Sequence, residues 1–157
     1  MTKISVPFTQ GNSSWIDKEF IDVRLNEHGQ MGSFARKFIP ANTLLDISHG
    51  ANLYAIPVTA AGRLDLDEFG LEFSDVFQLC RFGEFVICMG DRNKEDLTGI
   101  DFVNHSCRPN CAIKAAMQLW SLVDIEQDSE LFCDYRETDF VAEGIECWCN
   151  TDEKCVI

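Results

Sequence analysis

Short alternations of apolar and polar residues run along much of the chain, and they predict strands rather than helices. Residues 20–25 alternate as a half-buried strand does, and residues 33–38 and 43–47 predict a returning strand and a third strand. The glycine-bearing segment 26–32 and the Pro-Ala-Asn segment 40–42 predict the turns between them. This part of the chain is therefore expected to consist of strands joined by short turns.

The remainder continues the pattern less regularly. Residues 66–79 predict a short helix or irregular turns, and residues 90–95 predict a polar loop. Five further segments predict strands, two of them forming a hairpin across Ala116 and Met117: 51–58, 84–88, 111–115, 119–123 and 130–135. Many short strands with little helical periodicity indicate a mainly β fold with small sheets.

Length and charge narrow the class of protein. The 157 residues suit one compact domain, and no repeat or linker divides them. The formal net charge is -13, from 26 acidic and 13 basic residues. Such a surface repels phosphate backbones, which argues against direct nucleic-acid binding. It would attract a basic peptide or a cationic small molecule, although an acid excess can also serve solubility alone.

The chain also lacks membrane and export signals. No apolar run approaches the roughly 20 residues that span a bilayer. The first residues lack the apolar stretch and cleavage site of a secretory signal. We therefore expect an intracellular protein, cytoplasmic or nuclear, with no membrane association.

Eight cysteines are many for this length, and without export they indicate thiols or metal ligands rather than disulfides. Three lie in apolar stretches and are expected to be small core residues: Cys80, Cys88 and Cys133. The other five lie in two polar, turn-rich places: Cys107, Cys111, Cys147, Cys149 and Cys155. These five need a separate explanation.

Three segments carry candidate chemistry. Residues 102–111 read Phe-Val-Asn-His-Ser-Cys-Arg-Pro-Asn-Cys, and residues 130–135 read Glu-Leu-Phe-Cys-Asp-Tyr. The third segment is Cys-Trp-Cys at 147–149, with Cys155 six positions later. Taken singly, the first is an ordinary polar turn between strands and the second an ordinary strand.

In this order and spacing, the three segments resemble the SET-domain protein-lysine methyltransferases. Residues 104–110 match the Asn-His-Ser-Cys-x-Pro-Asn signature of that family, and residues 130–135 are similar to its Glu-Leu-x-x-Asp-Tyr signature. The cysteine-bearing tail resembles its post-SET segment, and residues 32–35 resemble the end of its N-terminal glycine motif. The resemblance spans roughly residues 20 to 155.

This resemblance implies a mainly β SET-domain fold of small curved sheets, with a C-terminal pseudoknot and a zinc-bound post-SET tail. It divides the chain into an N-terminal extension at 1–19, the SET domain at 20–140 and the post-SET segment at 141–157.

The resemblance also implies an S-adenosylmethionine-dependent N-methyltransferase that acts on a lysine side chain of a protein. Tyr135 is the expected catalytic residue. The expected cofactor-binding residues are Met31, Gly32, Phe34, Asn104, His105, Tyr135 and Trp148. A protonated lysine, with a pKa of about 10.4, is no nucleophile. A narrow apolar channel and the sulfonium charge would lower that pKa, and the Tyr135 hydroxyl would hold the amine in line with the methyl group.

By the same resemblance, zinc is bound by four thiolates: Cys107, Cys147, Cys149 and Cys155. Four thiolates with no open position form a structural zinc site, which would fix the tail beside the cofactor. Two alternatives remain open from the residues alone. The cysteines could be thiols without metal, or Cys111 could replace Cys107 as a ligand.

Several positions depart from the family pattern. Gln30 stands where the first glycine of the Gly-x-Gly turn belongs, unless Gly29 serves with a one-residue shift. Cys149 and Cys155 enclose five residues where the family usually has four, and Asn150 stands where glycine is common. Cys133 stands where the family usually has a Phe or Tyr that lines the lysine channel.

The smaller side chain of Cys133 would admit a more methylated lysine or a ligand other than lysine, or it is a neutral change of packing. Two alternative functions follow from these departures: a SET-like enzyme acting on a small metabolite, and a non-catalytic SET-like binding module. The expected partners are a basic protein or peptide substrate, or a small molecule.

Overall fold

The structure is a computed structural model, and it describes residues 3–4, 18–47, 52–72, 76–90, 97–114 and 118–135. Its strands and 3-10 helices are, in chain order, β1 (Lys3–Ile4), β2 (Ile21–Leu25), β3 (Met31–Ala35), β4 (Leu44–Ile47), β5 (Asn52–Pro57), η1 (Asp67–Phe69), β6 (Phe77–Phe82), β7 (Phe85–Gly90), η4 (Gly99–Phe102), β8 (Asn104–His105), β9 (Cys111–Lys114), β10 (Gln118–Ser121) and β11 (Phe132–Cys133). No helix in this described part is long and apolar enough to cross a membrane.

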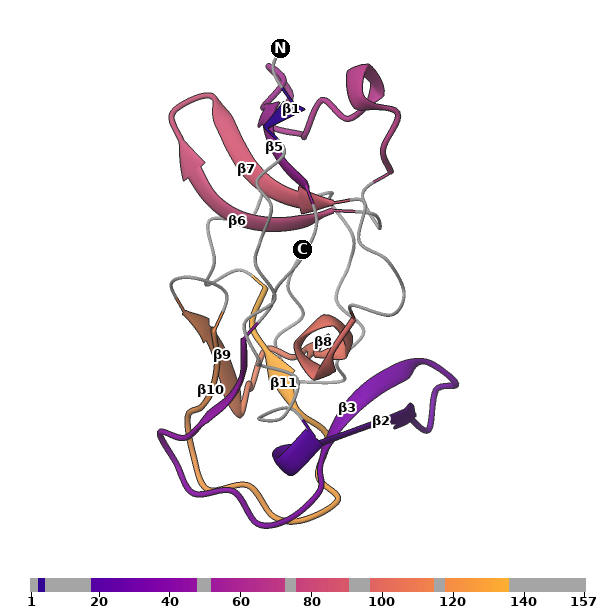
Figure 1. Ribbon diagram of the computed structural model, residues 1–157, viewed down its shortest axis with the longest axis vertical. Coiled ribbons are helices and arrows are strands. Elements are labelled where there is room, and N and C mark those ends of the chain that lie inside the picture. The colour runs from indigo at the N-terminus through magenta and orange to yellow at the C-terminus, as the bar shows by residue number, and fades with distance from the viewer. Residues whose placement is uncertain are drawn as a thin grey trace.

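Within the described residues the strands form four small sheets, which confirms the predicted mainly β architecture. Their strand orders are β1-β5-β7-β6, β4-β10-β9, β11-β8 and β2-β3. All pairs are antiparallel except β8 with β11, which is parallel. Figure 1 shows the four-stranded sheet at one end of the molecule and the smaller sheets together at the other.

The β2–β3 hairpin corrects one predicted boundary. Gly32 lies inside β3, paired with Arg24, rather than in the preceding turn. The turn is shorter because Asn26 closes it. The Asn26 N–H donates to the carbonyl of Gln30 at 2.7 Å, and its side-chain oxygen accepts from the N–H groups of His28 and Gln30, each at 3.0 Å. Gly29 supplies the positive φ of 74° that the turn needs.

Residues 66–79 contain both predicted and unpredicted structure. The short helix η1 lies there, as the sequence predicts, but β6 begins at Phe77 and was expected to be irregular. β6 pairs with β7 across a two-residue turn in which Gly83 has a φ of 56°, so that Phe82 faces Phe85. The strands β1 and β8 and the helix η4 were not predicted either.

Two groups of buried apolar side chains form the core. The first core cluster contains Ile21, Ala35, Ile39, Leu45, Ile100, Val103, Cys111, Leu119, Ile125, Leu131 and Cys133. The second core cluster lies under the four-stranded sheet and contains Tyr54, Ile56, Leu64, Val86 and Cys88. Cys88 and Cys133 are therefore small core residues, as predicted, while the side chain of Cys80 lies outside the described residues.

A buried carboxylate holds η4 against β4. Asp46 has no exposed surface, and its Oδ2 accepts from the Thr98 hydroxyl at 2.6 Å and from the Ile100 N–H at 2.9 Å. Its other oxygen accepts from the Ile47 N–H at 2.8 Å. Thr98 and Asp101 form a capping box at the start of η4. Because η4 ends two residues before Asn104, these bonds fix the entry to the Asn-His-Ser-Cys segment.

Candidate cofactor and substrate site

The parallel pair β8–β11 brings two of the three chemically interesting segments together. Asn104 lies opposite Phe132 and His105 lies opposite Cys133. The Ser106 N–H extends the ladder by donating to the carbonyl of Cys133 at 3.0 Å. The Asn-His-Ser-Cys turn and the Asp-Tyr segment are therefore neighbours in space, although nearly thirty residues separate them in sequence.

Asn110 holds this arrangement from the other side. Its side-chain nitrogen donates to the carbonyl of Glu130 at 2.8 Å, and its side-chain oxygen accepts from the N–H of Phe132 at 2.8 Å. The amide thus satisfies one acceptor and one donor of the 130–132 backbone, as a neighbouring strand would. This pairing accounts physically for an asparagine at this position.

The Asn104 amide connects β8 to the glycine strand β3. Its nitrogen donates to the carbonyl of Met31 at 3.1 Å and to Glu130 Oε1 at 2.9 Å. A Cβ on Gly32 would stand 2.5 Å from Glu130 Oε1, closer than such atoms approach one another. A side chain at position 32 would therefore have to push the Glu130 carboxylate aside, because that carboxylate packs closely against Gly32. The predicted cofactor residues Met31, Gly32 and Asn104 lie together.

His105 is almost fully buried, with 1% of its surface exposed. Its Nδ1 accepts from the Tyr135 N–H at 3.1 Å, so a neutral ring carries its proton on Nε2. Nε2 lies 3.6 Å from the sulfur of Cys107. The His105 ring therefore connects the backbone of Tyr135 to the thiol of Cys107, and it directs an N–H group at that sulfur.

Tyr135 lies beside His105, with their ring centroids 5.3 Å apart. The Tyr135 hydroxyl donates to the carbonyl of Val103 at 2.7 Å. Burial, and secondarily the nearby thiol of Cys133, raises the pKa of Tyr135 well above its ordinary range. The phenol is therefore neutral at physiological pH. Because its O–H group already donates a hydrogen bond to the Val103 carbonyl, its oxygen can meet a ligand only as an acceptor.

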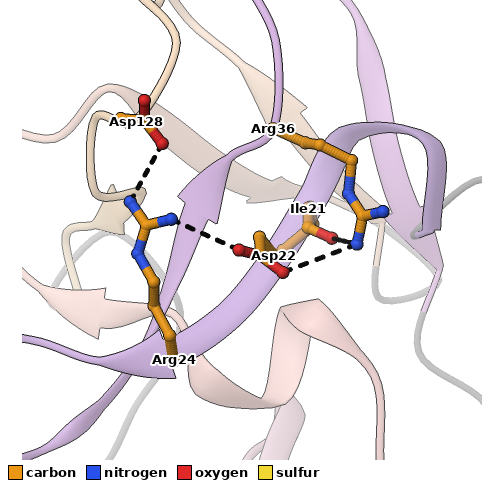
Figure 2. A network of polar contacts seen from close by, with 5 residues as sticks. All are labelled: Ile21, Asp22, Arg24, Arg36 and Asp128. Carbon is orange, nitrogen blue, oxygen red and sulfur yellow. Dashed lines mark hydrogen bonds and ion pairs between the residues drawn. The ribbon is translucent and has the colours of Figure 1, made fainter.

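Phe34 lies in β3 under a network of charged side chains. The guanidinium of Arg24 stands 4.2 Å from the centroid of the Phe34 ring. Figure 2 shows that Arg24 joins Asp22 to Asp128, at 3.2 Å each, while Arg36 contacts the other oxygen of Asp22 at 3.5 Å. The Arg24–Asp128 contact ties the hairpin to the segment that leads into Glu130.

The remaining predicted site residues divide into two groups. Cys133 is 3% exposed and packs in the first core cluster, and Cys107 is half-buried. Trp148, Cys147, Cys149 and Cys155 lie outside the described residues. In the part of the chain that the structure describes, no three His, Cys, Asp or Glu side chains form a group that could hold a metal ion. The zinc site thus stays a prediction.

Of the two cysteines in the turn, Cys107 suits metal binding better than Cys111. Cys111 has no exposed surface, and its burial raises its thiol pKa to about 12. Because zinc deprotonates a thiol that it binds, the difference between the two cysteines lies in burial: Cys107 is half-buried, whereas Cys111 packs in the first core cluster. Cys111 therefore serves as a core residue of β9.

Sequence reasoning did not assign a role to three residues of the site: Asn26, Asn110 and Glu130. Asn110 and Glu130 belong to the segments that carry the family signatures, so the signal was present there. Asn26 carries no comparable signal, because its contact with Glu130 at 3.3 Å arises only when the hairpin folds.

A comparison with protein-family models matches residues 30–136 to the SET domain. The chain therefore belongs to the SET-domain family, which confirms the resemblance drawn from the three segments. Members of this family are typically protein-lysine methyltransferases that use S-adenosylmethionine. A search of curated proteins by sequence gives no significant match.

Proposed function

We propose that this protein is an S-adenosylmethionine-dependent N-methyltransferase that acts on a lysine side chain of a protein. The observation that carries the proposal is the parallel register of β8 and β11, which sets Asn104 and His105 beside the strand that leads to Tyr135. Family membership supports the same conclusion. Cofactor residues and catalytic tyrosine come from separate segments, and one small sheet joins them.

The residues present suit the amino-acid end of the cofactor. Both hydrogen bonds of the Asn104 amide to other described residues use its nitrogen, so its oxygen is turned elsewhere and can accept from an ammonium group. We propose that Met31, Gly32, Phe34, Asn104 and His105 hold the cofactor, with Trp148 from the tail. When bound, S-adenosylmethionine supplies a methyl group made electrophilic by its sulfonium.

We propose that Tyr135 positions the amine rather than deprotonating it. A phenol with a raised pKa is a poor base at neutral pH, because almost none of it is ionised. As an acceptor it can orient an N–H of the amine, and most of the rate gain then comes from alignment. Cys133, two positions before Tyr135, packs in the first core cluster, and its small side chain would take up little of the space beside this amine.

Charge supports a basic substrate. The chain carries 26 acidic and 13 basic residues, so its field attracts lysine-rich segments and speeds their encounter. A cationic small molecule would experience the same attraction and is the alternative substrate. Label transfer to a protein or peptide distinguishes a lysine substrate from a small-molecule substrate.

The test compares the two tyrosines of the chain. Purified protein is incubated with methyl-labelled S-adenosylmethionine and lysine-rich peptides, and label transfer is measured. We expect Tyr135→Phe to lower transfer by about 100-fold, a typical loss for a residue that positions a reacting group. Tyr54→Phe makes the same chemical change in the second core cluster and should leave methyl transfer unchanged. Equal activity of wild type and Tyr135→Phe would contradict the role of Tyr135.

We also propose that Cys107 binds a structural zinc ion with Cys147, Cys149 and Cys155. The N–H that His105 directs at the Cys107 sulfur supports this, because a hydrogen bond from a neighbouring side chain orients a metal ligand. Metal analysis of the purified protein should find one zinc per chain, and Cys107→Ser should reduce it. Full zinc content in that variant would remove Cys107 from the ligand set.

A further inference from the structure

The carboxylate of Glu130 lies at the meeting point of three segments. One of its oxygens, Oε1, accepts from Asn104 Nδ2 at 2.9 Å and from Asn26 Nδ2 at 3.3 Å. The same oxygen packs against Gly32, where a Cβ would stand 2.5 Å away. Glu130 thus contacts the hairpin turn, the glycine strand and β8 with a single atom.

The backbone of Glu130 is held from two sides. On one side Glu130 forms a bridge with Phe34, and the following residue, Leu131, donates to the carbonyl of Ser33 at 2.7 Å. On the other side the Asn110 side-chain nitrogen donates to the Glu130 carbonyl. The backbone from which the Glu130 carboxylate extends is therefore fixed in place. Among the described residues, no lysine or arginine forms an ion pair with the carboxylate, so both bonds at Oε1 come from neutral amides.

These contacts decide which way the Asn104 amide is turned. Its two neighbours, the Met31 carbonyl and Glu130 Oε1, are both acceptors and can bond only to the amide nitrogen. The amide oxygen must then be turned away from them. If the amide rotated by half a turn, its oxygen would meet two acceptors and both bonds would be lost.

We propose that Glu130 is a positioning residue that locks the Asn104 amide so that its oxygen receives the ammonium group of the cofactor. This inference rests on the proposed function. An ammonium group is a donor, so it needs the oxygen and would be repelled by an amide nitrogen. By fixing the amide before the ligand arrives, Glu130 removes an ordering cost from binding. It is not itself required to touch the ligand.

The first experiment tests the lock without any cofactor. The side-chain amide signals of Asn104 are followed by nitrogen–proton NMR in wild type, Glu130→Ala and Glu130→Gln. We expect Glu130→Ala to shift and broaden these signals. Glu130→Gln should leave them close to wild type, because both bonds go to one oxygen and glutamine keeps one. Unchanged signals in Glu130→Ala would overturn the proposal whatever the protein does with a cofactor.

The second experiment measures binding of two ligands by calorimetry. S-adenosylhomocysteine carries the ammonium group, and methylthioadenosine lacks the amino-acid part. We expect Glu130→Ala to lower the affinity for S-adenosylhomocysteine about tenfold, roughly the effect of one charge-assisted hydrogen bond. The affinity for methylthioadenosine should stay within about twofold of wild type. Glu130→Gln should stay within about threefold of wild type for both. Glu126→Ala removes an exposed carboxylate from the same segment and should change neither affinity.

A coupling measurement sharpens the result. Asn104→Ala removes the amide that Glu130 is proposed to hold, so it should weaken binding of S-adenosylhomocysteine at least as much as Glu130→Ala. The Glu130→Ala, Asn104→Ala double variant should then bind no more weakly than Asn104→Ala alone. Fully additive losses, or a loss in Glu130→Gln equal to that in Glu130→Ala, would overturn the lock and indicate a direct charge effect. If wild type binds neither ligand, the proposed function fails, and the amide signals still decide the lock.

Discussion

The two core clusters differ in how much polar chemistry surrounds them. Seven of the eight buried polar residues of the described chain lie in the smaller sheets and η4, or directly beside them: Ser33, Asp46, Thr98, His105, Ser106, Ser121 and Asp134. The four-stranded sheet carries one, Gln78 in β6. Figure 1 shows the two regions at opposite ends of the molecule.

Apolar burial and buried hydrogen bonds do different work in the two regions. Apolar burial stabilises without specifying direction, so it can hold a sheet but cannot orient an amide or a phenol. Buried hydrogen bonds add little net stability, but they fix geometry and penalise alternatives. The candidate residues Gly32, Asn104, His105 and Tyr135 all lie in the region with the buried hydrogen bonds. The second region is expected to support stability without directing ligand binding.

The largest effect is expected from Asp46→Ala. It leaves the Ile100 N–H and the Thr98 hydroxyl without their buried acceptor, which should lower the free energy of unfolding by about 4 kcal/mol. Because η4 leads into Asn104, cofactor affinity should fall as well. Chemical denaturation and calorimetry measure both. Asp46→Asn keeps one side-chain oxygen, so it should lose less unfolding free energy than Asp46→Ala. If Asp46→Ala lowered stability but left cofactor affinity unchanged, η4 would not help to position the site.

A somewhat smaller effect is expected from Ile56→Ala in the second core cluster. Ile56 has no exposed surface, so removing its side chain should cost about 3 kcal/mol of unfolding free energy. Cofactor affinity, measured at a temperature where the variant is folded, should match wild type. If the affinity of Ile56→Ala fell tenfold, the two regions would be coupled and the comparison above would be wrong.

The smallest effect is expected from alkaline pH acting on the first core cluster. Burial raises the thiol pKa of Cys111 from 9.0 to about 12, so the unfolded chain loses this proton first as the pH rises. The stabilisation is complete below pH 9, falls as the pH rises above that value, and is lost by the folded value of about 12. Cys111 alone should lower the unfolding free energy by about 1.4 kcal/mol between about pH 8 and pH 10.

Denaturation of wild type and Cys111→Ala at both pH values measures this dependence. The variant should lose less stability on going to alkaline pH, because it lacks the thiol. Tyr135 acts with the same sign at still higher pH, since its pKa is also raised. Parallel pH profiles for the two proteins would show that the Cys111 thiol is not shielded from water in solution.

Local patterns predicted much of the fold, and the resemblance to the SET-domain family supplied the candidate site residues. Patterns of apolar and polar residues placed β2, β4, β5 and the β9–β10 hairpin, although β4 buries the adjacent residues Leu45 and Asp46 rather than a single face. β6 was missed because the sheet is irregular between Gln78 and Cys80, which breaks the two-residue period. β8 is only two residues long and pairs with a distant strand, so no local pattern could indicate it.

The polar contacts were less predictable for a different reason. Asp46 lies in a strand whose apolar neighbours gave no hint that a carboxylate would be buried there. Glu130 begins the predicted strand at 130–135, a position where a charged residue usually faces solvent. Its contacts with Gly32 and Asn104 exist only after three segments meet. The signatures predicted the candidate residues, and only the folded chain shows how Glu130 and Asn110 hold the segments that carry them.

The tie between the hairpin and the segment before β11 also has a consequence for folding kinetics. The contacts Arg24–Asp128 and Asn26–Glu130 each join residues 104 positions apart. Closing such a loop costs entropy before any contact compensates, so these contacts should form late. The β6–β7 hairpin, with two residues in its turn, can form within microseconds. The chain would therefore build its second region first and acquire a competent site only in the last step of folding.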